Sequence, residues 1–437
     1  MKVLLLLAGK SKRFWPLREK TLFPICGKTL LEHQVERLCA AGLDDIVLVG
    51  GNHNLEQAKE LFPEFEIIKQ EKIELGMRGA LLSALPSCGK ESVFIVCGND
   101  VIDPQGYKDT LGVFEKDGVQ GALLAQEVDS YFPGGYLTVG SDNRVTTIVE
   151  KPGEGNEPSN LVNIVAHIHD DASVLLDALG KVNEASDDGY EQALQKLFLD
   201  YNYQAVPHSG TWQAVKYPWH LLSLLPILLS EIKEQKIDPR SQIHESVVIK
   251  GNVIIEEDVK VMPEATIVGP CFIGKNSIVA NGALVRGSSI GANCVIGYNT
   301  EVKDSILHSY VWTHMTYIGD SVIGKNVTFG GGCITGNLRL DEESISSLIN
   351  GEKVNTGLTK FGTVIGNNCR IGIQVGINPG IKIGGGTFVS SGTLVPEDVG
   401  DEKFARIKDG VFTMSENKTK APNPEAREEY RKKIEKQ

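Results

Sequence analysis

An aliphatic residue recurs at every sixth position in the second half of this 437-residue chain. The unbroken run consists of Ile365, Ile371, Ile377, Ile383, Val389 and Val395, and shorter runs begin at Ile273, Ile290 and Ile323. Six residues is not a helical period, and hexapeptide repeats are typical of a parallel β-helix whose aliphatic side chains point into the core. Glycine often follows the aliphatic residue and suits the corners, where φ is often positive. The spacing therefore predicts a parallel β-helix over residues 241–400.

The first half of the chain has a different pattern. Up to about residue 222, short apolar runs alternate with helical periodicity. The pattern predicts strands over 3–8, 45–50 and 92–97 and helices over 30–41 and 76–85. Alternating strands and helices favour an α/β domain with a mostly parallel sheet.

Three further segments lie outside these two patterns. The pattern over residues 223–240 predicts a connecting helix that ends at Asp238-Pro239. The tail, 401–437, leaves the repeat and predicts a charged, solvated helix at its end. Two insertions interrupt the repeat at 308–315 and 338–361, and insertions in a solenoid form loops that often bind ligands.

Charge and hydropathy exclude several classes of protein. Lys and Arg number 44 against 56 Asp and Glu, a net charge of -12 that disfavours nucleic acid or an anionic membrane as the main partner. The longest apolar stretch, 221–229, is too short to cross about 30 Å of hydrocarbon. The apolar run at 3–8 is also too short for a secretory signal, and its basic residues follow it. We expect a cytoplasmic protein.

A small-residue turn follows the first predicted strand. It reads Ala8-Gly9-Lys10-Ser11-Lys12-Arg13, and Lys20 comes shortly after. Backbone N–H groups in such a turn can approach phosphate oxygens, and nearby cations can neutralise them. By itself, such a pattern is more often a solvated basic loop.

The same segment resembles the signature of the sugar-1-phosphate nucleotidylyltransferases, L-A-x-G-x-G-T-R followed by P-K. It matches at Ala8, Gly9 and Arg13, and the signature lysine falls on Lys20. Ser11 and Lys12 replace a glycine and a threonine of the signature. The resemblance implies a Rossmann-like nucleotidyltransferase domain over 1–222.

Further motifs resemble the family's in the same order, and the resemblance implies a role for each. Gln70 and Gly76 would read the base, and Asp100 would bind Mg2+. The residues implied for the sugar hydroxyls and phosphate are Gly135, Glu150, Lys151 and Asn163. Arg13 and Lys20 would clamp the triphosphate of UTP or dTTP while a sugar-1-phosphate oxygen attacks the α-phosphorus. A second metal ligand stays unassigned, because Ala214 and His220 stand where the family usually has a carboxylate.

A second constellation lies around the break in the repeat. Lys303, His314, Tyr317 and Asn337 occur in order, and a neutral imidazole can take the proton of an amino group. The stretch resembles the acetyltransferase half of bifunctional N-acetylglucosamine-1-phosphate uridylyltransferases, and the insertion with Lys360 resembles the archaeal type.

This second resemblance implies a left-handed β-helix, acetyl-CoA as co-substrate, and sites shared between the subunits of a homotrimer. His314 would be the base, Lys303 would hold the sugar phosphate, and Tyr317 and Asn337 would position the amine or the oxyanion. Lys360 would also contact substrate. Arg286 stands one position away from the arginine of the bacterial family, and a one-residue shift in a strand can turn a side chain to the opposite face.

The combined interpretation is a bifunctional enzyme. It would make a UDP- or dTDP-sugar and pyrophosphate from an NTP and a hexose- or N-acetylhexosamine-1-phosphate, and would also acetylate an amino-sugar-1-phosphate. Two alternatives stay open. The β-helix could be only structural or regulatory, or the chain could be a catalytically weak regulatory or scaffold subunit, as Ser11, Lys12 and Ala214 suggest.

Overall fold

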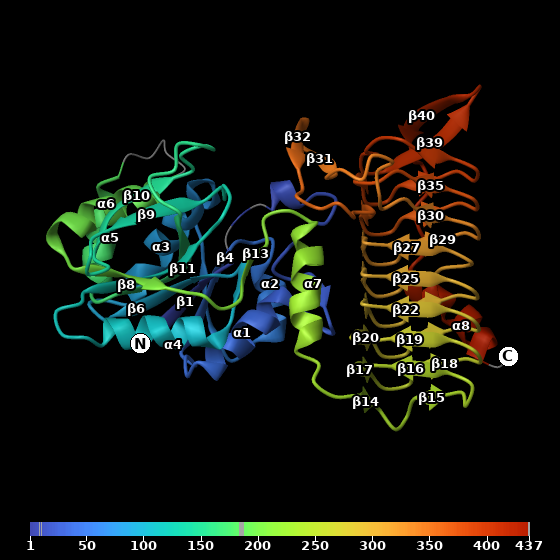
Figure 1. Ribbon diagram of the computed structural model, residues 1–437, viewed down its shortest axis with the longest axis horizontal. Coiled ribbons are helices and arrows are strands. Elements are labelled where there is room, and N and C mark those ends of the chain that lie inside the picture. Colours follow the sequence, from blue (N-terminus) through green and yellow to red (C-terminus); the bar gives the residue numbers. More distant parts are fainter. Residues whose placement is uncertain (8, 10, 183–187, 436–437) are drawn as a thin grey trace. The chain divides into compact units, whose positions relative to one another are not determined.

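The computed structural model describes residues 1–437 except 8, 10, 183–187 and 436–437. The chain forms two compact units (Figure 1). The first contains residues 1–10 and 29–214, and the second contains 11–28 and 215–437. The predicted boundary at 222 is close to the observed one at 214, but the early segment 11–28 belongs to the second unit.

A nine-stranded sheet is the centre of the first unit. Its strands are β1 (Lys2–Leu6), β4 (Ile46–Gly50), β5 (Glu66–Lys69), β6 (Val93–Cys97), β8 (Gly121–Glu127), β9 (Gly135–Val139), β10 (Val145–Glu150), β11 (Leu161–His169) and β12 (Tyr203–Pro207). The order is β10-β9-β11-β6-β1-β4-β5, with β8 paired to β11 and β12 paired to β8. Strands β6, β1, β4 and β5 are parallel to one another, whereas β11 is antiparallel to β6, β8 and β9. The sheet is therefore mixed, and the predicted parallel part is its β6-β1-β4-β5 half.

Six helices accompany this sheet within the described residues of the unit. They are α1 (Leu30–Ala40), α2 (Leu55–Leu61), α3 (Gly76–Ala84), α4 (Pro104–Phe114), α5 (Ala172–Gly180) and α6 (Gly189–Asp200). Strand β1 is buried from Val3 to Leu6, because parallel strands are covered on both faces. Thr29 and Glu32 form a capping box that fixes the start of α1 at Leu30, where the predicted helix also begins, and the helix ends one residue earlier than predicted.

The second unit is a parallel β-helix with three sheets, and the fold class predicted from the repeat is confirmed. The β14 sheet contains β14 (Lys236–Ile237), β17 (Val253–Ile255), β20 (Cys271–Ile273), β23 (Ser289–Ile290), β26 (Ile306–Leu307), β28 (Val322–Ile323), β33 (Thr363–Ile365) and β36 (Ile381–Ile383). The β16 sheet contains β16 (Val248–Lys250), β19 (Thr266–Val268), β22 (Leu284–Arg286), β25 (Glu301–Lys303), β27 (Tyr317–Gly319), β30 (Ile334–Thr335), β35 (Gly376–Ile377) and β38 (Leu394–Val395). Figure 1 shows these strands stacked coil upon coil.

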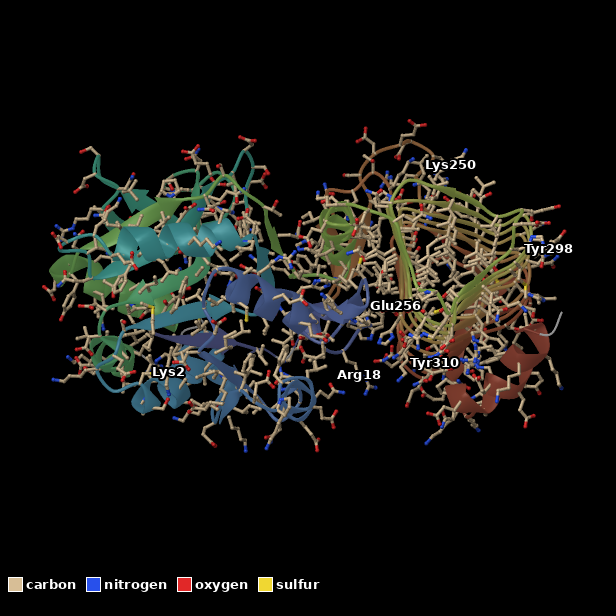
Figure 2. All side chains as sticks on the ribbon, turned by 90° about the horizontal axis from the view of Figure 1, so that it is seen from below. Lys2, Arg18, Lys250, Glu256, Tyr298 and Tyr310 are labelled. Atoms are coloured by element: carbon tan, nitrogen blue, oxygen red, sulfur yellow. The ribbon has the colours of Figure 1, made fainter. Side chains whose placement is uncertain are left out.

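The third face has two stretches that Trp312 connects. Its strands are β15 (Gln242–Ile243), β18 (Lys260–Val261), β21 (Ile278–Val279) and β24 (Val295–Ile296), followed by β29 (Thr328–Phe329), β34 (Arg370–Ile371), β37 (Phe388–Val389), β39 (Lys403–Lys408) and β40 (Val411–Glu416). Trp312 bridges Val295 and Thr328. Side chains fill the inside of the coils, whereas Lys250 and Tyr298 lie on the outer surface (Figure 2).

Stacking of three-sided coils explains the period of six, because each face contributes one aliphatic position and equivalent positions on successive coils lie about three hexapeptides apart. Ile267 pairs with Val285, Val285 with Val302, and Val302 with Ile318, and all four side chains are fully buried. Each aliphatic position thus packs on the equivalent position of the next coil, as a stacked solenoid core requires.

The predicted connecting helix differs in extent from the observed one. Helix α7 spans His220–Ser230 and lies against β26, and Lys236 already belongs to the first coil. The prediction of a helix to residue 240 was wrong because 236–243 pairs with the next coil, and strand pairing overrides local helix propensity.

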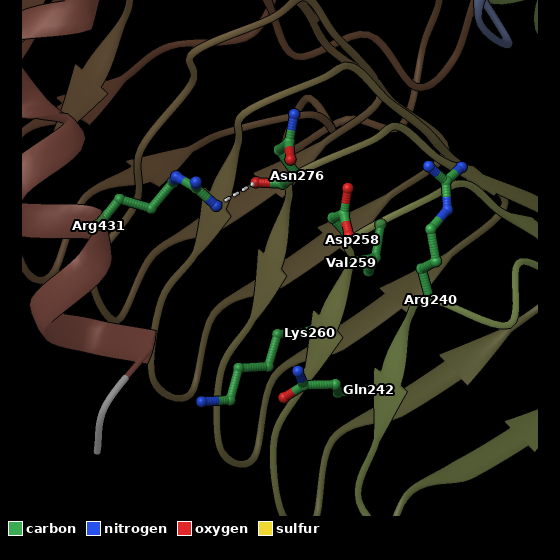
Figure 3. Close-up of a pocket in the computed structure, with 7 residues that line it drawn as sticks. All are labelled: Arg240, Gln242, Asp258, Val259, Lys260, Asn276 and Arg431. Atoms are coloured by element: carbon green, nitrogen blue, oxygen red, sulfur yellow. Dashed lines mark hydrogen bonds between the residues drawn. The ribbon is translucent and has the colours of Figure 1, made fainter.

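The long insertion and the tail have structure of their own. The insertion contains the hairpin β31 (Ser346–Ile349) and β32 (Glu352–Asn355). The tail ends in α8 (Glu428–Glu435), as the charge pattern predicts, but this helix is docked rather than solvated. Arg431 donates to the backbone oxygen of Asn276 at 3.2 Å and lines a polar pocket of about 460 Å³ (Figure 3). Ile434 packs against the buried cluster of Met262, Ile278, Ala280 and Val295. No helix of the described residues has the length and the apolar character needed to cross a membrane.

The early segment 11–28 is fixed along the β14 sheet. The backbone N–H of Cys26 donates to Ser289 Oγ at 2.8 Å, and Trp15 Nε1 donates to Asp401 Oδ2 at 3.1 Å. The ring of Phe23 meets that of His308 edge-on, with centroids 5.8 Å apart. This segment carries Arg13 and Lys20, so both predicted cations belong to the same unit as the β-helix.

Candidate active sites

The glycine turn is divided between the two units. Ala8 lies outside the described residues. Gly9 has φ of +124°, a conformation open to glycine, and its carbonyl oxygen lies 3.1 Å from His53 Nε2. Ser11 has φ of 46°, so the position that the family fills with glycine keeps a left-handed conformation here.

Arg13 and Lys20 are held by residues of the second unit. Lys20 Nζ donates to the carbonyl oxygen of Val215 at 3.3 Å, and the Arg13 guanidinium lies 5.8 Å from the centroid of the Tyr217 ring. Both cations therefore lie in one neighbourhood, beside the start of α7.

Gln70 is buried and its side-chain orientation is fixed. Its Nε2 donates to the backbone oxygens of Lys72 at 3.0 Å and Gly76 at 2.8 Å. Its Oε1 is buried and has no hydrogen-bond partner among the described residues. A Cβ at Gly79 would stand 2.3 Å from the Lys72 oxygen and 2.9 Å from Gln70 Nε2, so only glycine fits there. The structure thus brings Gln70 and Gly76 together and leaves one hydrogen-bond acceptor of Gln70 unused.

Asp100 begins a short strand whose partner lacks a carboxylate. Strand β7 (Asp100–Ile102) pairs with β13 (Trp212–Ala214), so Asp100 faces Ala214 directly. Trp212 Nε1 donates to Asp100 Oδ2 at 3.3 Å, and the adjacent Asn99 Oδ1 is buried with no hydrogen-bond partner within the described part of the chain. No group of three or more metal-ligating His, Cys, Asp or Glu side chains occurs among the described residues.

The four residues predicted for the sugar lie on neighbouring strands of the first unit. Gly135 on β9 pairs with Glu150 on β10, and Val162, next to Asn163 on β11, pairs with the following residue of β9. Glu150 Oε1 lies 3.0 Å from Lys151 Nζ. Lys151 has φ of 46°, and a left-handed conformation costs a non-glycine residue about 1–2 kcal/mol. Such local strain is typical of functional positions.

One titratable group beside this cluster was absent from the predictions. Burial, followed by the charge of Glu150, raises the pKa of Glu191 to about 7. Glu191 is on the first turn of α6, and nothing in the sequence places that turn beside β10.

A charged cluster on the β16 sheet contains three of the residues predicted for acetyl transfer. Asn337 Nδ2 donates to Tyr317 Oη at 3.2 Å and to Asp320 Oδ2 at 2.5 Å. Lys303 Nζ lies 3.2 Å from Asp320 and 2.8 Å from Asp304. We call Lys303, Asp304, Tyr317, Asp320 and Asn337 the Asp320 cluster. Asp320 is its central member, and no pattern in the sequence indicates that role.

Carboxylates control the charge of this cluster. Burial alone lowers the pKa of Lys303, but hydrogen bonding and attraction from Asp304 and Asp320 outweigh it and raise the pKa. Lys303 therefore remains an ammonium, as a phosphate-binding role requires, although Asp304 and Asp320 offset its charge.

The remaining predicted residues lie near this cluster in the chain. The exposed His314 imidazole has no hydrogen-bond, ion-pair or ring partner among the described residues. Lys360 is exposed where the two ends of the insertion meet, because Leu338 and Lys360 form a bridge and Phe361 N donates to Asn337 O at 3.0 Å.

The one-residue shift does not turn Arg286 to the opposite face from Lys303. Arg286 pairs in register with Lys303 and donates to Glu301 Oε1 from Nε at 2.9 Å and from Nη2 at 2.6 Å. The corner that follows β22 is one residue shorter than the equivalent corner of the preceding coil. Ile290, the next inward-facing residue, comes four positions after Arg286. In the preceding coil, Ile273 comes five positions after Val268. The shift is therefore absorbed in a corner rather than in a strand.

These two halves define the class of protein. Residues 2–215 match the nucleotidyl transferase family, and residues 252–287 match the bacterial transferase hexapeptide family of six repeats. The chain is thus a nucleotidyltransferase joined to a hexapeptide-repeat transferase domain.

Relatives that match over nearly the whole chain specify the family. The chain is 30% identical to a bifunctional sugar-1-phosphate nucleotidylyltransferase/acetyltransferase of Sulfurisphaera tokodaii, over 93% of this chain and 100% of the relative. It is 32% identical to the bifunctional protein GlmU of Methanococcus maripaludis (95% and 100% covered) and 31% identical to that of Methanocaldococcus jannaschii (94% and 99% covered). The chain belongs to this family of bifunctional sugar-1-phosphate nucleotidylyltransferases and acetyltransferases.

Proposed function

We propose that the chain transfers a uridylyl or thymidylyl group from UTP or dTTP to a hexose- or N-acetylhexosamine-1-phosphate. The observation that carries the choice of base is the orientation of Gln70. Its amide nitrogen is used by two backbone carbonyls, so only Oε1 can meet a base, and Oε1 is an acceptor. Uracil and thymine present an N3–H donor there, whereas cytosine presents an N3 acceptor.

The sugar phosphate is the nucleophile in this transfer. Lys151 holds its phosphate, and Gly135, Glu150 and Asn163 contact the ring. Arg13 and Lys20 hold the triphosphate and neutralise its charge. A sugar phosphate oxygen bonds to the α-phosphorus, the bond to the oxygen that bridges to the β-phosphate breaks, and pyrophosphate leaves.

Asp100 holds Mg2+ in this proposal. Asp100 and the unpartnered Asn99 Oδ1 supply oxygen donors, which suit an ion that is commonly bound by one or two carboxylates and substrate phosphates. When bound, Mg2+ supplies positive charge that offsets the phosphate oxygens. Because Ala214 faces Asp100, the β7–β13 pair offers a single carboxylate, and the substrate phosphates supply the remaining negative ligands.

The second activity is acetylation of an amino-sugar-1-phosphate with acetyl-CoA. Lys303 binds the phosphate, and the His314 imidazole takes a proton from the amino group. The amine nitrogen then attacks the thioester carbonyl and the thiol leaves, with Tyr317 and Asn337 positioning the reacting groups and Lys360 adding a substrate contact. The hydrogen bonds that join Tyr317, Asn337 and Asp320 support this assignment. We further infer a cytoplasmic homotrimer whose acetyl-transfer sites lie between subunits.

The test measures two released products in one panel. Pyrophosphate release is measured with ATP, GTP, CTP, UTP and dTTP, each with glucose-, N-acetylglucosamine- and glucosamine-1-phosphate. Thiol release from acetyl-CoA is measured with the same sugars. We expect pyrophosphate with UTP or dTTP but not CTP, and thiol with glucosamine-1-phosphate. Pyrophosphate without thiol would leave the β-helix a structural or regulatory role, and neither product would favour the scaffold alternative. Light scattering at three times the 47.5 kDa chain mass is expected for the trimer.

A further inference from the structure

A continuous chain of hydrogen bonds crosses the first unit from Asn163 to Tyr203. His167 Nε2 lies 2.8 Å from Asn163 Oδ1, and His167 Nδ1 lies 2.7 Å from Tyr190 Oη. His169 continues the chain, with Nε2 3.1 Å from Tyr190 Oη and Nδ1 2.8 Å from Tyr203 Oη. We call these five residues the Asn163 relay. Each has a relative exposure of 8% or less, so none of these hydrogen bonds exchanges readily with water.

Both imidazoles of the relay are neutral. Burial lowers the pKa of His169 to about 3, and burial together with the neighbouring His169 lowers the pKa of His167 well below its usual value. A neutral imidazole has one donor nitrogen and one acceptor nitrogen. Each histidine therefore fixes the direction of its second hydrogen bond by its first. If one ring nitrogen donates, the other must accept.

The direction of the whole relay follows from its first member. Asn163 Oδ1 can only accept, so His167 Nε2 carries the proton and His167 Nδ1 accepts from the Tyr190 hydroxyl. The single hydroxyl proton of Tyr190 is then used, and His169 Nε2 must donate to Tyr190 Oη. The remaining nitrogen, His169 Nδ1, accepts from the Tyr203 hydroxyl. All four hydrogen bonds point from Tyr203 toward Asn163.

We propose that His167 is a positioning residue for the nucleotidyl-transfer reaction, and that the Asn163 relay presents Asn163 to the sugar only as a hydrogen-bond donor. The relay occupies Asn163 Oδ1, which leaves the Nδ2 hydrogens for the substrate. This inference rests on the proposed function, in which Asn163 contacts the sugar.

The fixed polarity selects a class of sugar-1-phosphate. The group that meets Asn163 must accept a hydrogen bond, as a hydroxyl oxygen or an N-acetyl carbonyl oxygen does. An ammonium group has three donors and no acceptor, so a free amino-sugar phosphate places a donor against a donor. The nucleotidyl-transfer site therefore prefers N-acetylhexosamine- or hexose-1-phosphate over hexosamine-1-phosphate.

Removing the last donor of the relay removes its fixed direction. In Tyr203→Phe, His169 Nδ1 has no donor, so the opposite tautomers of both histidines become equally available. In the reversed state, His167 Nε2 is an acceptor, and Asn163 turns to donate to it. Oδ1 then faces the sugar. This weakens the binding of sugars that present a hydrogen-bond acceptor and favours those that present a hydrogen-bond donor. The ring remains in place, because a phenylalanine keeps the contact with Phe198.

The experiment compares Tyr203→Phe with the unaltered protein in two independent measurements. In steady-state kinetics, the KM for N-acetylglucosamine-1-phosphate is expected to rise about five-fold, the size of one hydrogen bond of about 1 kcal/mol. The KM for the NTP is expected to stay unchanged, and the preference for N-acetylglucosamine- over glucosamine-1-phosphate is expected to fall. Tyr107→Phe is the matched control, because it removes another buried hydroxyl of this unit, one that donates to Gln34.

Nitrogen-15 NMR of the histidine rings reports the tautomers without reference to activity. In the unaltered protein, His167 and His169 are expected to carry the proton on Nε2 and not to titrate between pH 5 and 8. In Tyr203→Phe, a signal of Nδ1–H at His167 is expected. If that variant does not fold, His167→Gln and His167→Met form a second pair. Glutamine keeps a donor toward Asn163 and is expected to keep the sugar KM within about two-fold, whereas methionine is expected to raise it about five-fold.

Each contrary result overturns a defined claim. An Nδ1–H tautomer at His167 in the unaltered protein would refute the relay direction, whatever the kinetics. Unchanged sugar KM in Tyr203→Phe and in His167→Met would refute the positioning role while leaving nucleotidyl transfer in place. Absence of pyrophosphate release by the unaltered protein would refute the proposed function and with it the sugar contact, even if the tautomers are as expected.

Discussion

The Asn163 relay of the first unit and the Asp320 cluster of the β-helix solve the same problem differently. Each surrounds a residue proposed to contact a sugar phosphate substrate. The relay is neutral, fully buried and built from a strand, a helix and a second strand. The Asp320 cluster is charged, partly exposed and built from neighbouring coils, in which Lys303 is paired with Asp304 and Asp320.

The difference shows how the side chains of each site are brought together. In the β-helix, the strand register places Tyr317 beside Glu301 and Gly319 beside Lys303, so sequence spacing and spatial neighbourhood coincide. In the relay, Tyr190 and His167 are 23 positions apart with no period between them. Burial makes the relay rigid and directional, whereas the Asp320 cluster is open to solvent ions, which screen exposed charges.

The largest effect is expected where the first unit relies on a single carboxylate. Asp100→Asn should lower nucleotidyl transfer by about 10³-fold at saturating Mg2+, because it removes the charge that fixes the ion. Pyrophosphate release is the measurement, and thiol release from acetyl-CoA should not change. Asp171→Asn is the control, since Asp171 caps α5 and asparagine also caps helices. Near-normal turnover of Asp100→Asn would identify another residue as the metal anchor.

The next effect tests whether the Asp320 cluster belongs to a reaction site. His314→Ala should lower thiol release with glucosamine-1-phosphate by about 10²-fold or more, as removal of a general base does. Pyrophosphate release should be unaffected. His244→Ala, which removes another exposed histidine of the β-helix, should change neither rate. Full thiol release by His314→Ala would mean that a different base serves this site.

A smaller effect tests whether nucleotidyl transfer depends on a contact with the β-helix. Trp15 anchors the segment of Arg13 and Lys20 to Asp401 of the β-helix. In Asp401→Asn, Oδ1 still accepts from Gly385 N, but an amide donor can face the indole N–H. We expect nucleotidyl transfer to fall about five-fold, mainly in kcat, because one hydrogen bond is worth about 1 kcal/mol.

The control for this change is Asp409→Asn, at the exposed turn of the β39–β40 hairpin, which should be silent. An unchanged kcat in Asp401→Asn would show that the segment needs no fixation by Trp15. Two functionally independent regions would then be the better description.

The smallest effect concerns His308, a neutral and partly buried side chain in the same unit as the charged Asp320 cluster. Burial, with a contribution from Lys325, lowers the pKa of His308 to about 4. Between about pH 6.5 and 4, the unfolded state therefore binds the extra proton, and the stability of the protein falls as the pH falls through this window. From pH 7 to pH 5, the loss amounts to about 2 kcal/mol at 1.4 kcal/mol per pH unit.

His308→Phe should remove this loss while keeping the edge-on contact with Phe23. Thermal denaturation at pH 7 and pH 5 measures it. Between pH 7 and pH 5, the thermal midpoint of the unaltered protein should fall by about 4–8 °C more than that of the variant. The exposed His244→Phe should behave like the unaltered protein, and equal shifts in His308→Phe and unaltered protein would show that His308 titrates normally.

Much of the architecture follows from local patterns. The aliphatic period predicted the β-helix, and the buried Ile365, Ile371 and Ile377 confirm it. The helical periodicity after Thr29 and the apolar run after Lys2 predicted α1 and β1 to within about two residues. These predictions succeeded because each depends on side chains that are close in sequence or separated by a constant period.

The candidate sites were predictable only in part. Motif order led to Gln70, Asp100 and Asn163, but no pattern pointed to Asp320, Gly79 or Glu191. Residue counting also could not orient Arg286, where a corner one residue shorter restores the register. Counting along the chain cannot tell whether a missing residue is lost from a strand or from a corner.

The sequence by itself determined the two-part organisation, the β-helix and the identity of most proposed substrate contacts, since periodicity and motif chemistry are local properties. Only the tertiary structure decided that residues 11–28 pack with the β-helix and that Tyr203 sets the polarity of Asn163. Both depend on contacts between segments far apart in the chain. Such contacts are selected by burial and by the requirement that buried polar groups be paired, and neither condition leaves a regular spacing in the sequence.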